Sequence, residues 1–178
     1  MQILYMAPAA PDRGGAFSAQ PGHVGDGILG QVPFNDLSSE MLASMGKHAA
    51  LNARIVAAQH PSTPASVLLT LSKDAELEVR ARVAGNPNSS EAVLKNLYAE
   101  GSTEIDRVLA ANRNLPSEIA MALYHRNRSY EDYGMNFMIP TRLAKNPSAS
   151  IELLKQLSRH VDNTVRQIAI QKLSERMV

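Results

Sequence analysis

The fold of this chain is decided by the stretch Val79-Arg80-Ala81-Arg82-Val83-Ala84-Gly85-Asn86-Pro87. Val79 and Val83 are four residues apart, so on a helix they share one face. The pattern predicts a short helix that ends at Asn86-Pro87. The residue before a proline avoids the α region, and the proline itself cannot continue the hydrogen-bond ladder.

The same pattern returns along the chain at a fixed spacing. Related stretches begin 26 residues earlier at Ala53, 26 residues later at Ile105, and then at Ile139 and Val165. Apolar triplets in matching register occupy Met41/Leu42/Met45, Val67/Leu68/Leu71, Val93/Leu94/Leu97, Ile119/Ala120/Leu123 and Leu153/Leu154/Leu157. Self-similarity at this period indicates an array of structural repeats.

Each repeat is expected to contain two helices, the second one carrying the apolar triplet. We expect this second helix to be capped by Thr63 before Pro64, by Ser89 before Ser90, and by Asn114 as a substitute in the third repeat. One helix pair cannot bury its apolar face alone, so four to five stacked pairs predict an all-α solenoid. The expected units are residues 53–78, 79–104, 105–138 and 139–164, with a cap at 165–178.

The N-terminal part has a different composition. Residues 1–33 contain 6 of the 10 Gly and 4 of the 10 Pro, and both residue types oppose regular structure. We predict an irregular arm at residues 1–36, flexible or loosely docked, followed by a helical-repeat domain at 37–178. A bacterial export leader without a Sec-type signal is the alternative interpretation of this arm.

The stretch at 79–87, its copies, and the trailing Leu94 and Leu97 resemble the leucine-rich repeat variant family over roughly residues 40–175. The resemblance implies a right-handed array of short paired helices related to HEAT repeats. It implies little about function, because repeat folds bind many unrelated targets. Some relatives carry a cysteine cluster for an iron–sulfur centre, which this chain lacks because it has no Cys. The spacing of 34 residues between Asn112 and Asn146 departs from the period and places an insertion at 126–137.

The insertion is the first candidate site. Insertions in helical arrays form loops on one face, often the binding face, and Tyr and Arg are favoured at interaction hot spots. We therefore predict a partner-binding loop, with local packing of its aromatic residues as the alternative. The candidate residues are Arg126, Arg128, Tyr130, Tyr133 and Phe137.

A basic face is the second candidate site. Arg54, Arg80 and Arg166 share one repeat position, and Arg82 and Arg142 share another. Residues 47–178 carry 17 basic and 13 acidic side chains, so such a face suits an acidic peptide or a phosphate backbone. The alternative, which we favour, is a ladder of ion pairs between repeats. Its expected carboxylates are Asp74, Glu78, Glu104 and Asp106.

Composition narrows the function classes. The 178 residues include no Cys and no Trp, which excludes disulfide scaffolds, zinc–cysteine sites and thiol nucleophiles. A net charge of +1 argues against a protein that coats nucleic acid. The five His residues show no metal-ligand spacing, and no apolar run is long enough to span a membrane.

We therefore expect a non-enzymatic protein-interaction module that needs no metal and no cofactor. The expected location is the cytoplasm. The alternatives are a nucleic-acid-binding repeat protein that uses the Arg positions, and an exported bacterial effector. The oligomeric state stays open.

Overall fold

The computed structural model describes residues 32–127 and 137–176. Within these ranges every regular element is a helix, which confirms the predicted all-α class, and no strand is present. A short 3-10 helix, η2 (Phe34–Asp36), comes first. The α-helices that follow are α1 (Ser39–Met45), α2 (Leu51–Gln59), α3 (Ala65–Leu71), α4 (Leu77–Gly85), α5 (Glu91–Ala99), α6 (Thr103–Leu109), α7 (Ser117–Asn127), α8 (Met138–Lys145), α9 (Ile151–Leu157) and α10 (Asn163–Arg176).

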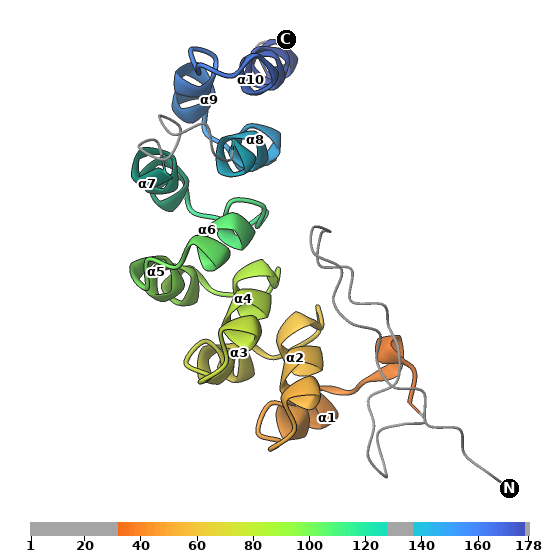
Figure 1. The fold of residues 1–178 in the computed structure, drawn as a ribbon. Helices are drawn as coiled ribbons and strands as arrows, with labels where there is room; N and C mark the ends of the chain where they lie inside the picture. Colours follow the sequence, from red (N-terminus) through yellow and green to blue (C-terminus); the bar gives the residue numbers. More distant parts are fainter. Residues whose placement is uncertain (1–31, 128–136, 177–178) are drawn as a thin grey trace, which may run out of the picture.

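The α-helices alternate between two layers of a curved stack (Figure 1). The even-numbered helices, α2 to α10, line the concave side, and we call them the inner row. The odd-numbered helices, α1 to α9, form the outer row on the convex side. Each inner-row helix contacts the next one, so the inner row forms a continuous surface along the stack.

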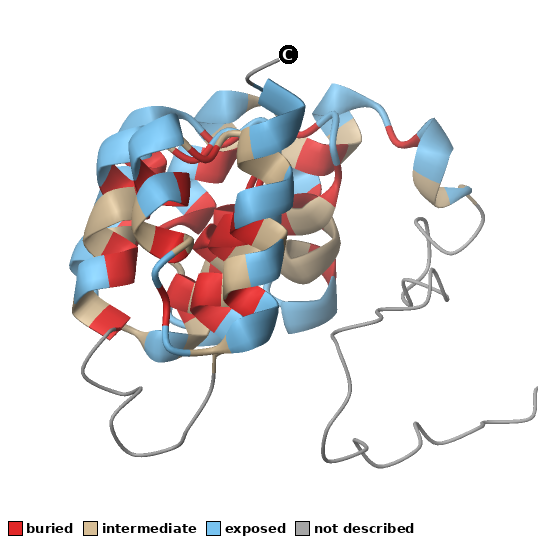
Figure 2. Ribbon diagram, turned by 90° about the horizontal axis from the view of Figure 1, so that it is seen from above, coloured by how far each residue is buried: buried red, intermediate tan, exposed pale blue. Residues whose placement is uncertain are grey.

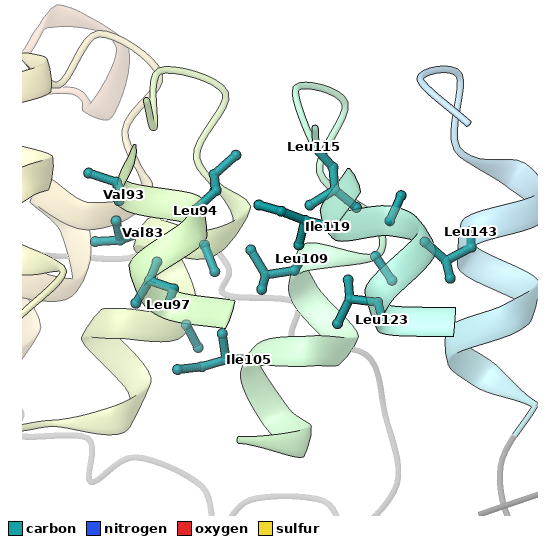
Figure 3. Packing of buried hydrophobic residues seen from close by; sticks show 14 of the residues in the cluster. Val83, Val93, Leu94, Leu97, Ile105, Leu109, Leu115, Ile119, Leu123 and Leu143 are labelled. Atoms are coloured by element: carbon teal, nitrogen blue, oxygen red, sulfur yellow. The ribbon is translucent and has the colours of Figure 1, made fainter. Parts of the chain in front are cut away.

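The core lies where the two layers meet (Figure 2). The apolar triplets of the outer-row helices point into this core, and Leu94 and Leu97 are fully buried. Figure 3 shows the same packing around Leu109 and Leu123, which come from α6 and α7. Because such a buried leucine fills space that no other group occupies, truncating one to Ala costs about 2–5 kcal/mol.

Buried asparagines join neighbouring inner-row helices. Asn86, Asn112 and Asn146, which we call the asparagine column, follow the C-terminal ends of α4, α6 and α8. Each side-chain oxygen accepts the backbone N–H two residues further on, at 2.8 Å in all three cases. Each Nδ2 donates to two backbone carbonyl oxygens at the C-terminal end of the preceding inner-row helix. These are Ala58 and His60 for Asn86 (2.7 and 2.9 Å), Ala84 and Asn86 for Asn112 (2.6 and 3.3 Å), and Ala110 and Asn112 for Asn146 (3.0 and 2.8 Å).

Burying the side-chain amides of the column has a cost in free energy that their hydrogen bonds offset. Burying an amide without partners is unfavourable, but here three of its hydrogen-bonding capacities are used in each case. The carbonyl oxygens that accept from Nδ2 lie in or just after the last turn of a helix, where they have no partner within the helix. The column therefore fixes the spacing between neighbouring inner-row helices as well as the end of each of these helices.

Serine side chains begin several helices. The hydroxyl oxygens of Ser38, Ser90, Ser102 and Ser150 each accept a backbone N–H from three residues further on. Such a cap satisfies one of the four N–H groups that a helix start leaves free. These serines explain why α1, α5, α6 and α9 start where they do.

The caps predicted at Thr63, Ser89 and Asn114 are wrong. Thr63 and Ser89 are buried and donate their hydroxyl hydrogens backwards, to Ala57 O and Val83 O, both at 2.6 Å. These carbonyls lie in the last turns of α2 and α4, and Val83 O accepts the backbone N–H of Asn86 as well. Asn114 donates to Pro87 O at 2.5 Å and so also serves the preceding layer. A hydroxyl near a helix start can accept an N–H of the helix that follows or donate to a carbonyl of the helix that precedes. The buried hydroxyls of Thr63 and Ser89 do the second.

Residues 32–37 pack against the N-terminal end of the helical stack. Val32 and Phe34 are partly buried against the core, and Leu37 is buried. The His60 imidazole bonds Phe34 O through Nε2 at 2.8 Å, and its ring lies 4.5 Å from the Phe34 ring. Since Nδ1 of His60 accepts the Ser62 N–H, Nε2 is the donor. His60 thus follows the end of α2 and extends the asparagine column towards the N-terminus. The rest of the predicted arm, residues 1–31, lies outside the described residues.

Candidate interaction surface

Three arginines of the inner row bind the chain's own backbone. Arg54, Arg80 and Arg166 occupy the same position near the starts of α2, α4 and α10. Each Nη1 donates to the carbonyl oxygens five and six residues earlier, in the turn before its helix. These are Ala49 and His48 for Arg54 (2.8 and 3.1 Å), Ala75 and Asp74 for Arg80 (3.0 and 2.7 Å), and Val161 and His160 for Arg166 (2.6 and 2.8 Å).

Two of these arginines also pair with a carboxylate 20 residues later. Arg54 Nε lies 2.7 Å from Asp74, and Arg80 Nε lies 3.0 Å from Glu100. Burial of Asp74 opposes its ionisation. The hydrogen bonds from Arg54 and from the Glu76 backbone, together with the two arginine charges, outweigh that effect and lower the pKa of Asp74. The arginines are therefore paired with carboxylates, as the favoured interpretation holds, but each pair lies within one predicted unit, 53–78 or 79–104, and not between repeats.

The helix pair α6 and α7 contains the same kind of ion pair with its charges exchanged. Asp106 stands where the other layers have arginine, and Arg126, 20 residues later, stands where they have a carboxylate. Arg126 Nη1 lies 3.1 Å from Asp106 Oδ1, and Asn127 Nδ2 donates to Oδ2 at 3.3 Å. Arg126 also donates to Tyr98 O at 2.8 Å, and its guanidinium lies 3.6 Å from the centre of the Tyr98 ring.

Asp106 is the most deeply buried carboxylate of these pairs, with a side chain that is 2% exposed. Burial raises the pKa of Asp106, although Asn127 and Arg126 act in the opposite direction. The fold therefore disfavours the ionised carboxylate, and Arg126 limits that penalty. This arrangement stabilises the junction of α5, α6 and α7.

The arginines of the predicted basic face all have partners within the chain. The charges of Arg54, Arg80 and Arg166 are directed into the chain itself. Arg82 and Arg142 belong to a different position on α4 and α8. Arg82 pairs with Glu78 at 3.2 Å, and Arg142 Nη1 donates to Arg107 O at 3.1 Å.

The four carboxylates expected in the ladder, Asp74, Glu78, Glu104 and Asp106, each pair with an arginine. The pairs differ from the prediction because they do not connect repeats: Glu78 and Glu104 pair within their own helices, with Arg82 and Arg107. Sequence reasoning missed Glu100. The signal was present, because Asp74 and Glu100 are both 20 residues after an arginine that repeats at the 26-residue period.

The predicted binding loop at 126–137 is only partly described. Arg126 is the penultimate residue of α7 and takes part in the Asp106 pair. Arg128, Tyr130 and Tyr133 lie outside the described residues. Phe137 precedes α8, is half-buried, and lies edge-on to the His160 ring with 5.6 Å between ring centres. For Phe137 the local-packing alternative describes the observed contact.

Charge is distributed unequally between the two rows. The inner-row helices carry nine Lys or Arg and four Asp or Glu, whereas the outer-row helices carry three and four. The inner row therefore has an excess of five positive charges, and the outer row has an excess of one negative charge. An asymmetry of this kind raises the local concentration of negatively charged partners on one side of a protein.

A second inner-row position combines apolar and basic side chains. Val56, Arg82, Val108, Arg142 and Ile168, which we call the inner stripe, occupy the same place on α2, α4, α6, α8 and α10. All five are half-buried. Sequence reasoning recognised the two arginines of this position and missed the three aliphatic residues that alternate with them.

Two structural features bear on other functions. Among residues 32–127 and 137–176, no three His, Asp or Glu side chains are grouped as metal ligands. In the same ranges, no helix combines the length and the apolar character needed to cross a bilayer.

Comparison with family models, with curated proteins and with solved structures gives no match to this chain.

Proposed function

We propose that this chain is a right-handed solenoid of 26-residue helix pairs, similar to the leucine-rich repeat variant family, and that it works as a non-enzymatic protein-binding module. The hydrogen bonds of the asparagine column support the repeat assignment, since two of its members reach back 26 residues to their counterparts. The inner row carries the functional part of the proposal. It is a continuous surface whose charge excess is not found on the outer row.

The test compares two charge reversals in the full-length protein. Arg82→Glu with Arg142→Glu changes the inner row, and Lys95→Glu with Lys155→Glu makes the same change in net charge on α5 and α9 of the outer row. We expect affinity capture from native lysate to lose specific partners with the first variant only. Equal recovery with both variants would refute the inner row as the binding surface.

The loop needs a separate variant. Arg126 must be kept, because it neutralises buried Asp106 and its removal would confuse folding with binding. The informative change is therefore Ala at Arg128, Tyr130 and Tyr133 together. If this variant binds the captured partner with unchanged affinity, the insertion is not part of the interface.

Nucleic acid is the competing ligand class for a basic surface. Phosphate binding releases counterions, so affinity for nucleic acid falls steeply between about 50 and 200 mM salt. A protein complex based on mixed apolar and polar contacts depends less on salt. A steep salt dependence together with binding of an RNA or DNA oligonucleotide would favour the competing class.

A further inference from the structure

We propose that His60 is a pH-sensitive latch, which holds residues 32–36 on the N-terminal end of the stack while its imidazole is neutral and releases them when it is protonated. The proposal is carried by the place of His60 in the fold, where it extends the asparagine column by one repeat. The asparagines of the column cannot change their charge, whereas histidine does so between about pH 5 and 8. This device does not depend on the proposed protein-binding function.

The imidazole reproduces the hydrogen bonds of the asparagine amides. Nδ1 of His60 accepts the N–H two residues further on, that of Ser62, at 3.1 Å. Nε2 donates to Phe34 O, 26 residues earlier, at 2.8 Å. Asn86 makes the same two kinds of bond, with the N–H two residues further on and with a carbonyl oxygen 26 residues earlier. An amide oxygen always accepts, whereas Nδ1 of an imidazole accepts only while it carries no proton.

Protonation breaks this pattern at a buried site. With a proton on Nδ1, two donors face each other at the Ser62 N–H, and His60 is only 2% exposed. The positive charge would strengthen the bond from Nε2 to Phe34 O and the contact with the Phe34 ring, whose centre lies 4.5 Å away. Burying an unpaired charge costs more than these contacts return, so the protonated imidazole favours exposure to water.

No neighbouring carboxylate offsets this charge. The helices around His60 carry six charged side chains: Asp36 of η2, Glu40 of α1, Arg54 of α2, and Glu78, Arg80 and Arg82 of α4. The three arginines are paired with carboxylates, and Asp36 and Glu40 are exposed. In the part of the chain that the structure describes, none of the six forms an ion pair with His60.

The latch controls access to an apolar surface. Val32 and Phe34 are partly buried against the core, so release of residues 32–36 exposes both side chains to water. Segments at the end of a fold open at a smaller cost in free energy than the core does. Mild acidification is therefore expected to release these residues while the α-helices remain folded.

A tryptophan in place of Phe34 reports the release, since the chain contains no Trp. Tryptophan emission is blue-shifted while the ring is packed on the stack and red-shifted when water surrounds it. For full-length Phe34→Trp we expect a reversible red shift between about pH 7.5 and about pH 5. The docking constant should fall about tenfold for each pH unit, because release is coupled to the uptake of one proton. Circular dichroism should show unchanged helicity over the same range.

Two further variants in the Phe34→Trp background test the assignment to His60. His60→Asn restores the amide of the column, so its emission should stay blue-shifted at both pH values. His48→Asn is the matched control, because Nδ1 of His48 accepts the Ala50 N–H at 3.0 Å but the residue is exposed. The red shift should persist in this control. A full red shift in His60→Asn, or loss of helicity with the same midpoint, would overturn the proposal.

The unmodified chain provides a second measurement, because tryptophan is larger than the side chain of Phe34. In NMR spectra the backbone amide signals of Phe34 and Asn35 should move towards random-coil positions with the same midpoint as the Cε1–H signal of His60. Amide signals that keep their folded positions while His60 titrates would overturn the latch.

Discussion

Arg126→Ala is expected to destabilise the fold strongly, because it leaves a buried carboxylate without its counter-charge. Asp106 is 2% exposed and Arg126 is 29% exposed, and their atoms are 3.1 Å apart. Two charges about 4 Å apart interact with about 4 kcal/mol at an effective dielectric constant of about 20. Partial exposure of Arg126 and the remaining bond from Asn127 reduce that figure. We expect a loss of about 3 kcal/mol, of which the lost stacking on Tyr98 contributes about 0.5–1 kcal/mol.

The measurement is urea unfolding at neutral pH, followed by circular dichroism. Lys95→Ala is the matched control, since its pair with Glu91 is exposed on both sides and contributes little. Asp106→Asn should be far milder than Arg126→Ala, because it removes the charge that the fold disfavours. The double variant should recover most of the stability lost in Arg126→Ala.

The pH dependence gives an independent check with a definite sign. Because the folded pKa of Asp106 is raised, the stability linked to this group is fully present below its ordinary pKa of about 4 and is lost as pH rises through the folded value. The penalty of Arg126→Ala should therefore shrink in acid, where Asp106 is protonated. A penalty equal to that of Lys95→Ala, or one that does not change with pH, would refute the reasoning.

Three further outcomes are expected from the same unfolding assay. Asn112→Ala should lose about 2–4 kcal/mol, because two buried carbonyls and one N–H lose their partner, and a loss below that of Ser90→Ala would contradict the role of the column. Ser90→Ala should cost about 1 kcal/mol through loss of the α5 cap. Asp74 has a lowered folded pKa, so its stabilising contribution is present above pH about 4 and is lost as pH falls through the folded value. Asp74→Asn should therefore flatten the acid limb of the stability curve, and an unchanged limb would contradict it.

The helices were predictable because each is specified by neighbours in sequence. The end of α4 at Asn86-Pro87 is specified by the proline, and the burial of Leu94 and Leu97 by their common face. The caps were not predictable in the same way. Ser89 and Ser90 are chemically identical candidates, and only the packing of Ser89 against the end of α4 makes Ser90 the cap of α5.

The candidate site, too, was predictable only where residues near in sequence determine it. Repetition in sequence identified the arginine positions and several of their carboxylate partners. It did not reveal that Arg54 and Arg80 turn back to their own backbone, since this depends on the path of the preceding turn. The exchange between Asp106 and Arg126 looked like an interruption of a basic track, whereas in space it preserves the pair with its charges reversed.

The longer sequence spacing before Asn146 shows which contact of the stack stays constant. Asn146 reaches the carbonyl oxygens of Ala110 and Asn112 across a sequence spacing of 36 and 34 residues, yet its hydrogen bonds match those made by Asn112 to the layer before it. The contact is therefore constant while the length of chain between the contacts varies. Because the extra residues follow α7, at the junction between an outer and an inner helix, they leave the inner row uninterrupted from α6 to α8. A change in the length of this connection is thus expected to alter the loop and to leave Val108 and Arg142 in register along the inner stripe.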